Sequence, residues 1–287
     1  MLRPRSKIAL IGIPFDANSS YLRGPAEAPA SIRKALDCDS TNTWTESGKD
    51  IAEMIEDLGD LRFDSGMEPM QTITEGITGA LQRGYAPLAL GGDHSVTYAI
   101  VRAVASVHSG LTILHFDAHP DLYDEFQGSR DSHACPFARI MESGLARRLV
   151  QVGIRTANDH QRSQAKRFAV EMIEMQHWKN QLPALEPPLY LSFDLDVLDP
   201  AFAPGVSHHE PGGMSTREAL GAIQSLRIPL VGADVVELNP RRDPSGITAM
   251  CAAKIVKEIA AKMMDSPGRQ TAPAKGNRAA PSHRKSI

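Results

Sequence analysis

The chain has 287 residues and a formal net charge of −3 at pH 7, with 42% hydrophobic and 23% charged residues. This balance is typical of a globular protein with a sizeable core, and it excludes a chain that is disordered throughout. No run approaches the roughly 18–20 apolar residues of a membrane helix, and the slightly acidic charge gives no general reason to bind nucleic acid or a membrane surface.

Six short apolar runs predict strands, at 8–13, 87–90, 111–116, 149–154, 189–194 and 230–236. Most of these runs are continuous rather than alternating with polar residues, which is typical of parallel strands buried on both faces. Between them, amphipathic stretches predict helices at 69–83, 95–108, 136–142, 216–226 and 247–264. Ser95 and Thr216 stand where they can cap two of these helices. In the last helix, a four-residue spacing predicts one buried stripe, formed by Ile247, Cys251, Ile255, Ile259 and Met263.

Strands that alternate with helices through short connections predict βαβ units in one large α/β domain, spanning residues 1–265. The segment 266–287 holds five Lys or Arg residues, no acid and almost no large apolar residue. We expect a disordered basic tail there, because so little apolar surface cannot offset the entropy of ordering the chain. The N-terminus lacks the pattern of a targeting signal, and the three cysteines form no CxxC pair. Both observations predict a cytoplasmic protein with reduced thiols.

Acids and histidines follow four of the predicted strands. His94 lies in GGDHS, and three potential ligands lie in DAHPD, namely Asp117, His119 and Asp121. Asp194 and Asp196 lie in DLD, and Glu237 lies in VELNP. The carboxyl ends of parallel strands meet at one edge of a sheet, and alternate residues of extended chain project to one side. We therefore expect these side chains to face one point.

Six such ligands crowded together would repel one another and lose solvation unless a cation joined them. Carboxylate oxygens with some imidazole nitrogen suit Mn²⁺ and, less well, Zn²⁺, Fe²⁺ or Ni²⁺. Four carboxylates and two imidazoles exceed the need of one ion, so the pattern predicts two metals that share bridging carboxylates.

Several nearby polar residues have a simpler explanation. We expect Asp93 to brace its loop, His115 to be a hydrogen-bonded core histidine, and Asp199 before Pro200 to form a turn. His208 and His209 are adjacent and would point apart in extended chain, so we expect loop structure or a cleft wall rather than metal binding.

Taken together, GGDHS, DAHPDLYD, SFDLDVLDPAFAPG and VELNP resemble the ureohydrolase (arginase/agmatinase) family over roughly residues 7–264. DAHPDLYDEF, SHACPFARIME, ARRLVQVGIR and PAFAPGVSHHEPGG are most similar to the plant-type arginase branch. The resemblance implies a three-layer αβα fold with a mostly parallel eight-stranded sheet, in a homotrimer or homohexamer. It also implies two Mn²⁺ ions per chain, the first held by His94, Asp117, Asp121 and Asp194 and the second by His119, Asp117, Asp194 and Asp196. Asp117 and Asp194 would bridge them.

The resemblance also implies the catalytic roles. Water activated by the metals attacks the guanidinium carbon while the carboxylate of Glu237 holds the guanidinium. Asp121 accepts the proton of the nucleophile and passes it to the leaving nitrogen. His133, in SHACPF, exchanges protons with solvent, since imidazole titrates near neutral pH.

The plant-type motifs favour L-arginine as the substrate, giving L-ornithine and urea. We expect Tyr123 and Arg130, in the loop 122–132, to meet the substrate's α-carboxylate. Asn158 matches the acid that meets the α-amine in animal-type arginases, but it lacks the charge, which predicts weaker substrate binding.

Other functions stay open at this stage. The first alternative is an agmatinase, which converts agmatine to putrescine and urea, or another guanidino-acid ureohydrolase. A non-catalytic metal-binding regulator is disfavoured because every matched catalytic position holds a competent residue. A metal-dependent deacetylase is disfavoured by the paired DAHxD and DxD motifs, since deacetylases use a mononuclear ligand pattern.

Overall fold

The computed structural model describes residues 7–63 and 66–264, so the predicted basic tail at 266–287 lies outside the described residues. Within this part of the chain, eight strands form one sheet in the order β2-β1-β3-β8-β7-β4-β5-β6, and every neighbouring pair is parallel. The strands are β1 Ile8–Gly12, β2 Ile55–Asp60, β3 Ala86–Leu90, β4 Leu111–Phe116, β5 Ala146–Ile154, β6 Glu171–Glu174, β7 Leu189–Asp194 and β8 Leu230–Val236. This confirms the predicted sheet.

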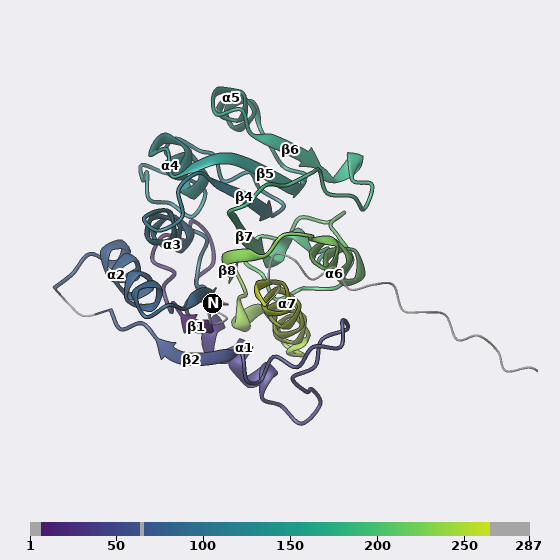
Figure 1. Ribbon diagram of the computed structural model, residues 1–287. Helices are drawn as coiled ribbons and strands as arrows, with labels where there is room; N and C mark the ends of the chain where they lie inside the picture. Colours follow the sequence, from purple (N-terminus) through teal and green to yellow (C-terminus); the bar gives the residue numbers. More distant parts are fainter. Residues whose placement is uncertain (1–6, 64–65, 265–287) are drawn as a thin grey trace, which may run out of the picture.

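Helices cover both faces of the sheet (Figure 1). One face carries α1 Ala28–Leu36, α6 Thr216–Ser225 and α7 Ile247–Met263, and the other carries α2 Pro69–Gln82, α3 Val96–Ala105, α4 Pro136–Glu142 and α5 Asp159–Arg167. Each helical layer packs on the sheet through its own apolar core, which confirms the three-layer αβα architecture. None of the helices in the described ranges has the length and apolar character needed to cross a bilayer.

The alternation of side chains explains why the central strands read as continuous apolar runs. In β4, Leu111 and Ile113 enter the core beneath α2 and α3, whereas Leu114 and Phe116 enter the core beneath α6 and α7. Successive side chains of a strand point to opposite faces, and here both faces are covered. The sequence therefore predicts the bounds of β4, β7 and β8 correctly.

Two strands and two α-helices escaped prediction because they lie toward the margins of the sheet. The edge strands β2 and β6 each pair with one neighbour only and carry acidic residues, so neither shows an apolar run. The helix α5 (DHQRSQAKR) is almost wholly polar, and α1 carries Pro29 in its first turn. Elements that are half exposed need little apolar sequence, and their pattern is correspondingly weak.

One of the two predicted helix caps is wrong, and the other is right in position but makes no capping bond. The α6 cap is Ser215 rather than Thr216, because the Ser215 hydroxyl accepts from the Glu218 amide while the Glu218 carboxylate accepts from the Ser215 amide. Ser95 stands at the start of α3 but its hydroxyl donates to Asp93 instead of capping.

The predicted stripe on α7 is also not continuous. Ile247 is 47% exposed, whereas Ile255 and Ile259 are buried. Steps of four residues advance by roughly 40° beyond a full turn, so a long series winds away from the core. The buried face is completed instead by Ala252 and Val256.

The four central strands end at the same level. Leu90 of β3 pairs with Val235 of β8, Val235 pairs with Phe193 of β7, and Phe193 pairs with Phe116 of β4. The loops that follow these neighbouring strands therefore start side by side at one edge of the sheet, where ligands bind in open α/β folds.

The capping box of α6 gives the first testable prediction. We expect Ser215→Ala to lower the free energy of unfolding by about 1 kcal/mol, because it leaves the Glu218 amide without its acceptor. Thr216→Ala, one residue later, should cost less than about 0.5 kcal/mol. Urea denaturation of both variants measures the difference, and equal losses would show that the reciprocal bonds of Ser215 add nothing.

Candidate active site

The loop after β3 is forced close to the N-terminal segment. The Asp93 amide donates to the Phe15 carbonyl at 2.9 Å, and a Cβ at Gly92 would lie 1.6 Å from that oxygen. Only glycine allows this approach. This close approach at Gly92 places His94, two residues later, against the ends of β4 and β7.

Three carboxylates surround one nitrogen of His94. Its Nδ1 lies 3.1 Å from Asp117 Oδ2, 3.0 Å from Asp121 Oδ2 and 3.1 Å from Asp194 Oδ2. All four side chains are buried. Donor atoms of an octahedral divalent ion, at about 2.1 Å from the metal, lie about 3 Å apart, so this spacing is the one that a shared cation would require.

The opposite edge of His94 shows which nitrogen carries the proton. Nε2 lies 3.0 Å from Ser192 Oγ, and that hydroxyl donates to Asp234 Oδ1 at 2.7 Å. Since the Ser192 proton is committed to Asp234, Ser192 must accept from Nε2–H. The lone pair of Nδ1 is then directed at the carboxylates and has no hydrogen-bond donor among the described residues. Such an atom fits a metal ligand held by its second nitrogen.

The electrostatics of this cluster favour a positive charge beside Nδ1 of His94. Burial lowers the pKa of His94, but its contacts with Asp117, Asp121 and Asp194 outweigh burial and raise that pKa well above its usual value. Burial and the charges of Asp196 and Asp117 raise the pKa of Asp194 well above its usual value. The carboxylates thus stabilise positive charge at Nδ1, from a proton or from a metal ion.

A second ligand group adjoins the first. His119 Nδ1 lies 3.0 Å from Asp196 Oδ2 and 3.3 Å from Asp117 Oδ1. Asp117 therefore faces His94 with one oxygen and His119 with the other, at the centre of both groups. The structure thus brings together the six predicted ligands, His94, Asp117, His119, Asp121, Asp194 and Asp196.

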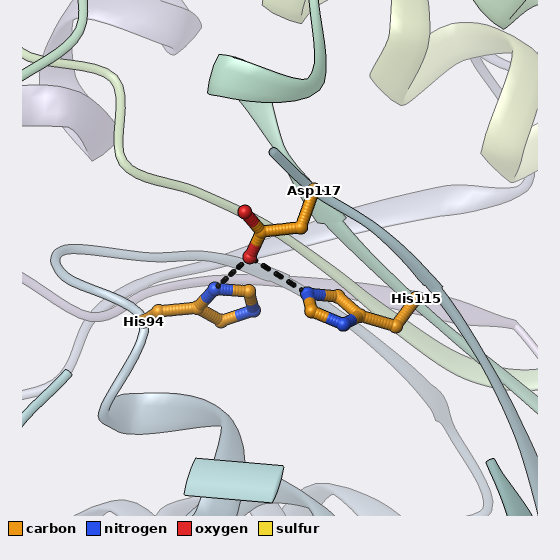
Figure 2. A group of neighbouring side chains, drawn as sticks. All are labelled: His94, His115 and Asp117. Carbon is orange, nitrogen blue, oxygen red and sulfur yellow. Dashed lines mark hydrogen bonds and ion pairs between the residues drawn. The ribbon is translucent and has the colours of Figure 1, made fainter. Parts of the chain in front are cut away.

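His115 lies beneath this cluster and is not one of its free ligands. Figure 2 shows Asp117 Oδ2 between His94 and His115, whose Nε2 lies 2.8 Å away. The Gln151 amide donates to the Pro120 carbonyl at 2.6 Å and faces His115 Nδ1 at 3.1 Å. Nδ1 must therefore accept, so Nε2–H donates to Asp117. The prediction of a hydrogen-bonded core histidine agrees with these contacts.

Glu237 and His133 form a buried pair beside the ligands. Glu237 Oε1 accepts from the His94 amide at 2.9 Å and lies 2.8 Å from His133 Nδ1. Burial lowers the pKa of His133, but Glu237 raises it to about 9, so the ring is charged at neutral pH. The second oxygen, Oε2, is buried without a hydrogen-bond donor among the described residues. It is the acceptor available for a cationic ligand.

Two of these acids have strained backbones. Asp121 has φ 49° and Glu237 has φ 64°, in the left-handed region. For residues with a Cβ this conformation costs roughly 1–3 kcal/mol, and it is found most often at functional sites. The strained backbone conformation of Asp121 and Glu237 accompanies the placement of both carboxylates in the lining of one pocket.

A pocket of about 140 Å³ opens over the cluster. Its lining includes the predicted residues His119, Asp121, Tyr123, His133, Asp194, Asp196 and Glu237. It also includes Ser20, Thr156 and Gln161, which sequence reasoning missed. They are neutral residues, and Thr156 directly follows the motif ARRLVQVGIR, but only their proximity in space to the acids and histidines reveals them individually.

The remaining predicted contacts lie elsewhere. Asn158 is not in the pocket lining: it caps α5 and donates to the Tyr123 hydroxyl at 2.6 Å. Arg130 also lies outside this pocket, with its guanidinium paired to Asp124 at 2.8 Å and to Glu142 at 2.9 Å. Of the two residues expected to meet the α-carboxylate, the structure places only Tyr123 in the pocket wall.

The residues given a structural explanation have the expected surroundings. Asp93 accepts from the Asn18 and Ser95 amides, and Asp199 accepts from the Ala201 and Gly212 amides. His208 lines the pocket, whereas its neighbour His209 bonds the Pro204 carbonyl at 2.7 Å.

Comparison with known proteins agrees with this geometry. The model of the Arginase family matches residues 6–261. Arginase 1 of Arabidopsis thaliana is 48% identical over 279 residues, covering 90% of this chain and 82% of that protein. The human guanidino acid hydrolase is 34% identical and covers 88% of this chain and 76% of that protein. The structure of arginase from Medicago truncatula matches with a TM-score of 0.85 at 46% identity, covering 90% of this chain and 88% of that one.

These relatives correct one expectation and confirm another. The predicted cytoplasmic location is wrong by this comparison, since the Arabidopsis arginase and the human hydrolase are both named as mitochondrial proteins. The basis of that prediction was weak, because reduced cysteines do not distinguish the cytoplasm from an organelle interior. The resemblance to plant-type arginases is confirmed by sequence and by structure. The chain belongs to the arginase family and is an enzyme of the amidinohydrolase class.

Proposed function

We propose that this enzyme releases urea from a guanidino substrate with two Mn²⁺ ions, and that the substrate is L-arginine, which yields L-ornithine. One observation carries the proposal. A buried lone pair on His94 faces three carboxylates, and two of these, Asp121 and Asp194, line a pocket with Glu237, whose Oε2 has no hydrogen-bond donor among the described residues. The first feature suits a metal ion and the second suits a guanidinium group.

The donor set supports the metal assignment. Carboxylate oxygens and imidazole nitrogens are ligands that Mn²⁺ accepts readily. His94, Asp117, Asp121 and Asp194 would hold one ion, and His119, Asp117, Asp194 and Asp196 the other. When bound, the two ions lower the pKa of water and so supply a nucleophile near neutral pH.

The protein's own residues orient the substrate. Glu237 is fixed through Oε1 by the His94 amide and by His133, which leaves Oε2 to accept N–H groups of a planar guanidinium. A substrate held there has its central carbon beside the ligand cluster, and this orientation removes much of the entropic part of the barrier.

Proton transfer falls to two further residues. Asp121, turned into the pocket by its left-handed backbone, would accept the proton of the nucleophile and pass it to the leaving nitrogen. His133 exchanges protons between the pocket and solvent.

The choice of arginine rests on the relatives and on the far wall of the pocket. The chain is 48% identical to an arginase but 34% identical to a guanidino acid hydrolase. Tyr123, oriented by Asn158, and the polar side chains of Thr156 and Gln161 offer neutral hydrogen-bonding groups for an amino-acid head group. Arg130 has no part in this wall, because its guanidinium is paired with Asp124 and Glu142. The homotrimer or homohexamer implied by the resemblance stays a prediction.

Metal removal tests the first part of the proposal. Chelation should abolish urea release, and reloading should restore it at two Mn²⁺ per chain by elemental analysis. Asp117→Asn should lose both metal and most activity, because Asp117 contacts both ligand groups. Asp50→Asn, an exposed carboxylate, should keep both. One bound ion in a fully active protein would contradict the two-metal site.

The substrate is tested by urea release from arginine, agmatine, guanidinobutyrate and free guanidine, each with Mn²⁺-loaded enzyme. We expect kcat/KM for arginine to exceed that for agmatine by more than about tenfold, a transition-state preference of at least ~1.4 kcal/mol. A preference of the same size for agmatine would make this protein an agmatinase.

The charge of His133 predicts the pH profile. His133 must be neutral to accept a proton, and its raised pKa keeps it protonated until the pH passes through about 9. We therefore expect kcat to rise between pH 7 and about 9. His133→Asn should be slower and should lack this rise. A wild-type kcat that falls with increasing pH over this range would instead assign His133 the role of an acid.

A further inference from the structure

The N-terminal loop 16–24 reaches the pocket. Ser20 lines the pocket, and the ring of Tyr21 packs on His208, with the centroids 5.7 Å apart. This segment follows β1, so it comes from outside the four strands that supply the ligands.

Several buried groups fix the position of this loop. Asp93 Oδ2 accepts from the Asn18 amide at 3.0 Å, and the Asn18 carbonyl accepts from the His133 amide at 3.2 Å. Asp16 Oδ2 accepts from the Gly24 amide at 2.7 Å, which closes the other end of the loop. The loop is therefore tied both to the segment that precedes His94 and to the segment that carries His133.

Ser20 completes the surroundings of His133. Its Oγ lies 2.8 Å from His133 Nε2, while Nδ1 of the same ring lies 2.8 Å from Glu237 Oε1. The imidazole is thus held at both nitrogens, and the ring of His208 packs against it with centroids 5.1 Å apart. His133 is buried, whereas Ser20 is only partly buried.

We propose that Ser20 is the positioning residue of His133 and the route by which its proton reaches solvent. This inference rests on the proposed function, because it gives His133 the part of a proton carrier. Nδ1 is occupied by Glu237, so a proton leaves the ring most directly from Nε2, where the Ser20 hydroxyl can both accept and donate.

The transfer is balanced at every atom. The His133 Nε2–H bond breaks as a new O–H bond forms on Ser20, and the original hydroxyl proton of Ser20 passes to a water or a buffer base. The hydroxyl is unchanged at the end and His133 is neutral. The hydroxyl then rotates, so that its oxygen lone pair again faces Nε2 and its proton again points toward solvent.

The test compares Ser20→Ala, which deletes the hydroxyl, with Ser20→Thr, which keeps it. Ser19→Ala is the matched control, because the Ser19 hydroxyl faces Asp93 at 3.3 Å rather than His133. We expect Ser20→Ala to lower kcat on the order of tenfold, with KM within about threefold of wild type. Ser20→Thr and Ser19→Ala should stay within about threefold in both constants. High concentrations of imidazole buffer should restore part of the lost kcat in Ser20→Ala and leave the wild type unchanged.

Three kinetic results would overturn the inference. An unchanged kcat in Ser20→Ala would show that the hydroxyl carries no proton. A raised KM at unchanged kcat would make Ser20 a substrate contact instead. A loss that neither threonine nor buffer restores would show that Ser20 is needed only for the shape of the loop. Thermal unfolding of each variant shows whether the loop fold is retained.

A second readout does not depend on turnover. In protein labelled with ¹⁵N-histidine and loaded with diamagnetic Zn²⁺ in place of paramagnetic Mn²⁺, the His133 signals are identified by their loss in His133→Gln. Ser20→Ala should shift the Nε2 resonance and leave Nδ1 in place, and Ser19→Ala should shift neither. If the shift occurs but the wild type releases no urea, the proposed function fails and the contact stands. If urea release is normal and Nε2 does not shift, only the Ser20 inference fails.

Discussion

The site depends on one electrostatic requirement, which is that three buried carboxylates need a positive charge beside Nδ1 of His94. Asp117, Asp121 and Asp194 stay within about 3 Å of that nitrogen, and without a cation their mutual repulsion and lost hydration would destabilise the fold. Two buried strand residues behind the ring, Ser192 and Asp234, determine which nitrogen of His94 faces the carboxylates. The other residues of the site are arranged around this cluster.

The parallel sheet holds the side chains of the site in fixed positions. The strands β3, β8, β7 and β4 are neighbours and end in register, so their loops deliver His94, Glu237, Asp194 and Asp117 to one edge. The apolar layers on both faces fix the strands, so a side chain directly after a strand end is also held in place. Asp121 and Glu237 are held in left-handed backbone conformations that short loops of flexible sequence would not maintain.

Most of the fold, and the clustering of the six acids and histidines, could be predicted from sequence because both depend on residues with a strong local signal. Buried strands read as apolar runs, and acids or histidines directly after them are conspicuous. The edge strands β2 and β6 and the polar helix α5 lack that signal. The substrate wall was predicted less well. Arg130 follows the ligands closely in sequence, yet its loop folds back so that it pairs with Glu142 on α4. Ser20 and Gln161 are ordinary polar residues whose role comes only from their neighbours in space.

The floor and the far wall of the pocket differ in how much sequence change the fold tolerates there. Its floor consists of residues at or next to the ends of the central strands, where a shifted backbone would disturb the entire sheet. Its far wall, with Tyr123, Thr156 and Gln161, comes from a loop, from the connection into α5 and from the first turn of α5, an outer helix that packs beside an edge strand. Insertions and substitutions in such outer connections leave the central strands in place. The same hydrolytic floor is therefore compatible with many different walls, and this architecture lets a family diversify its substrates while keeping one chemistry.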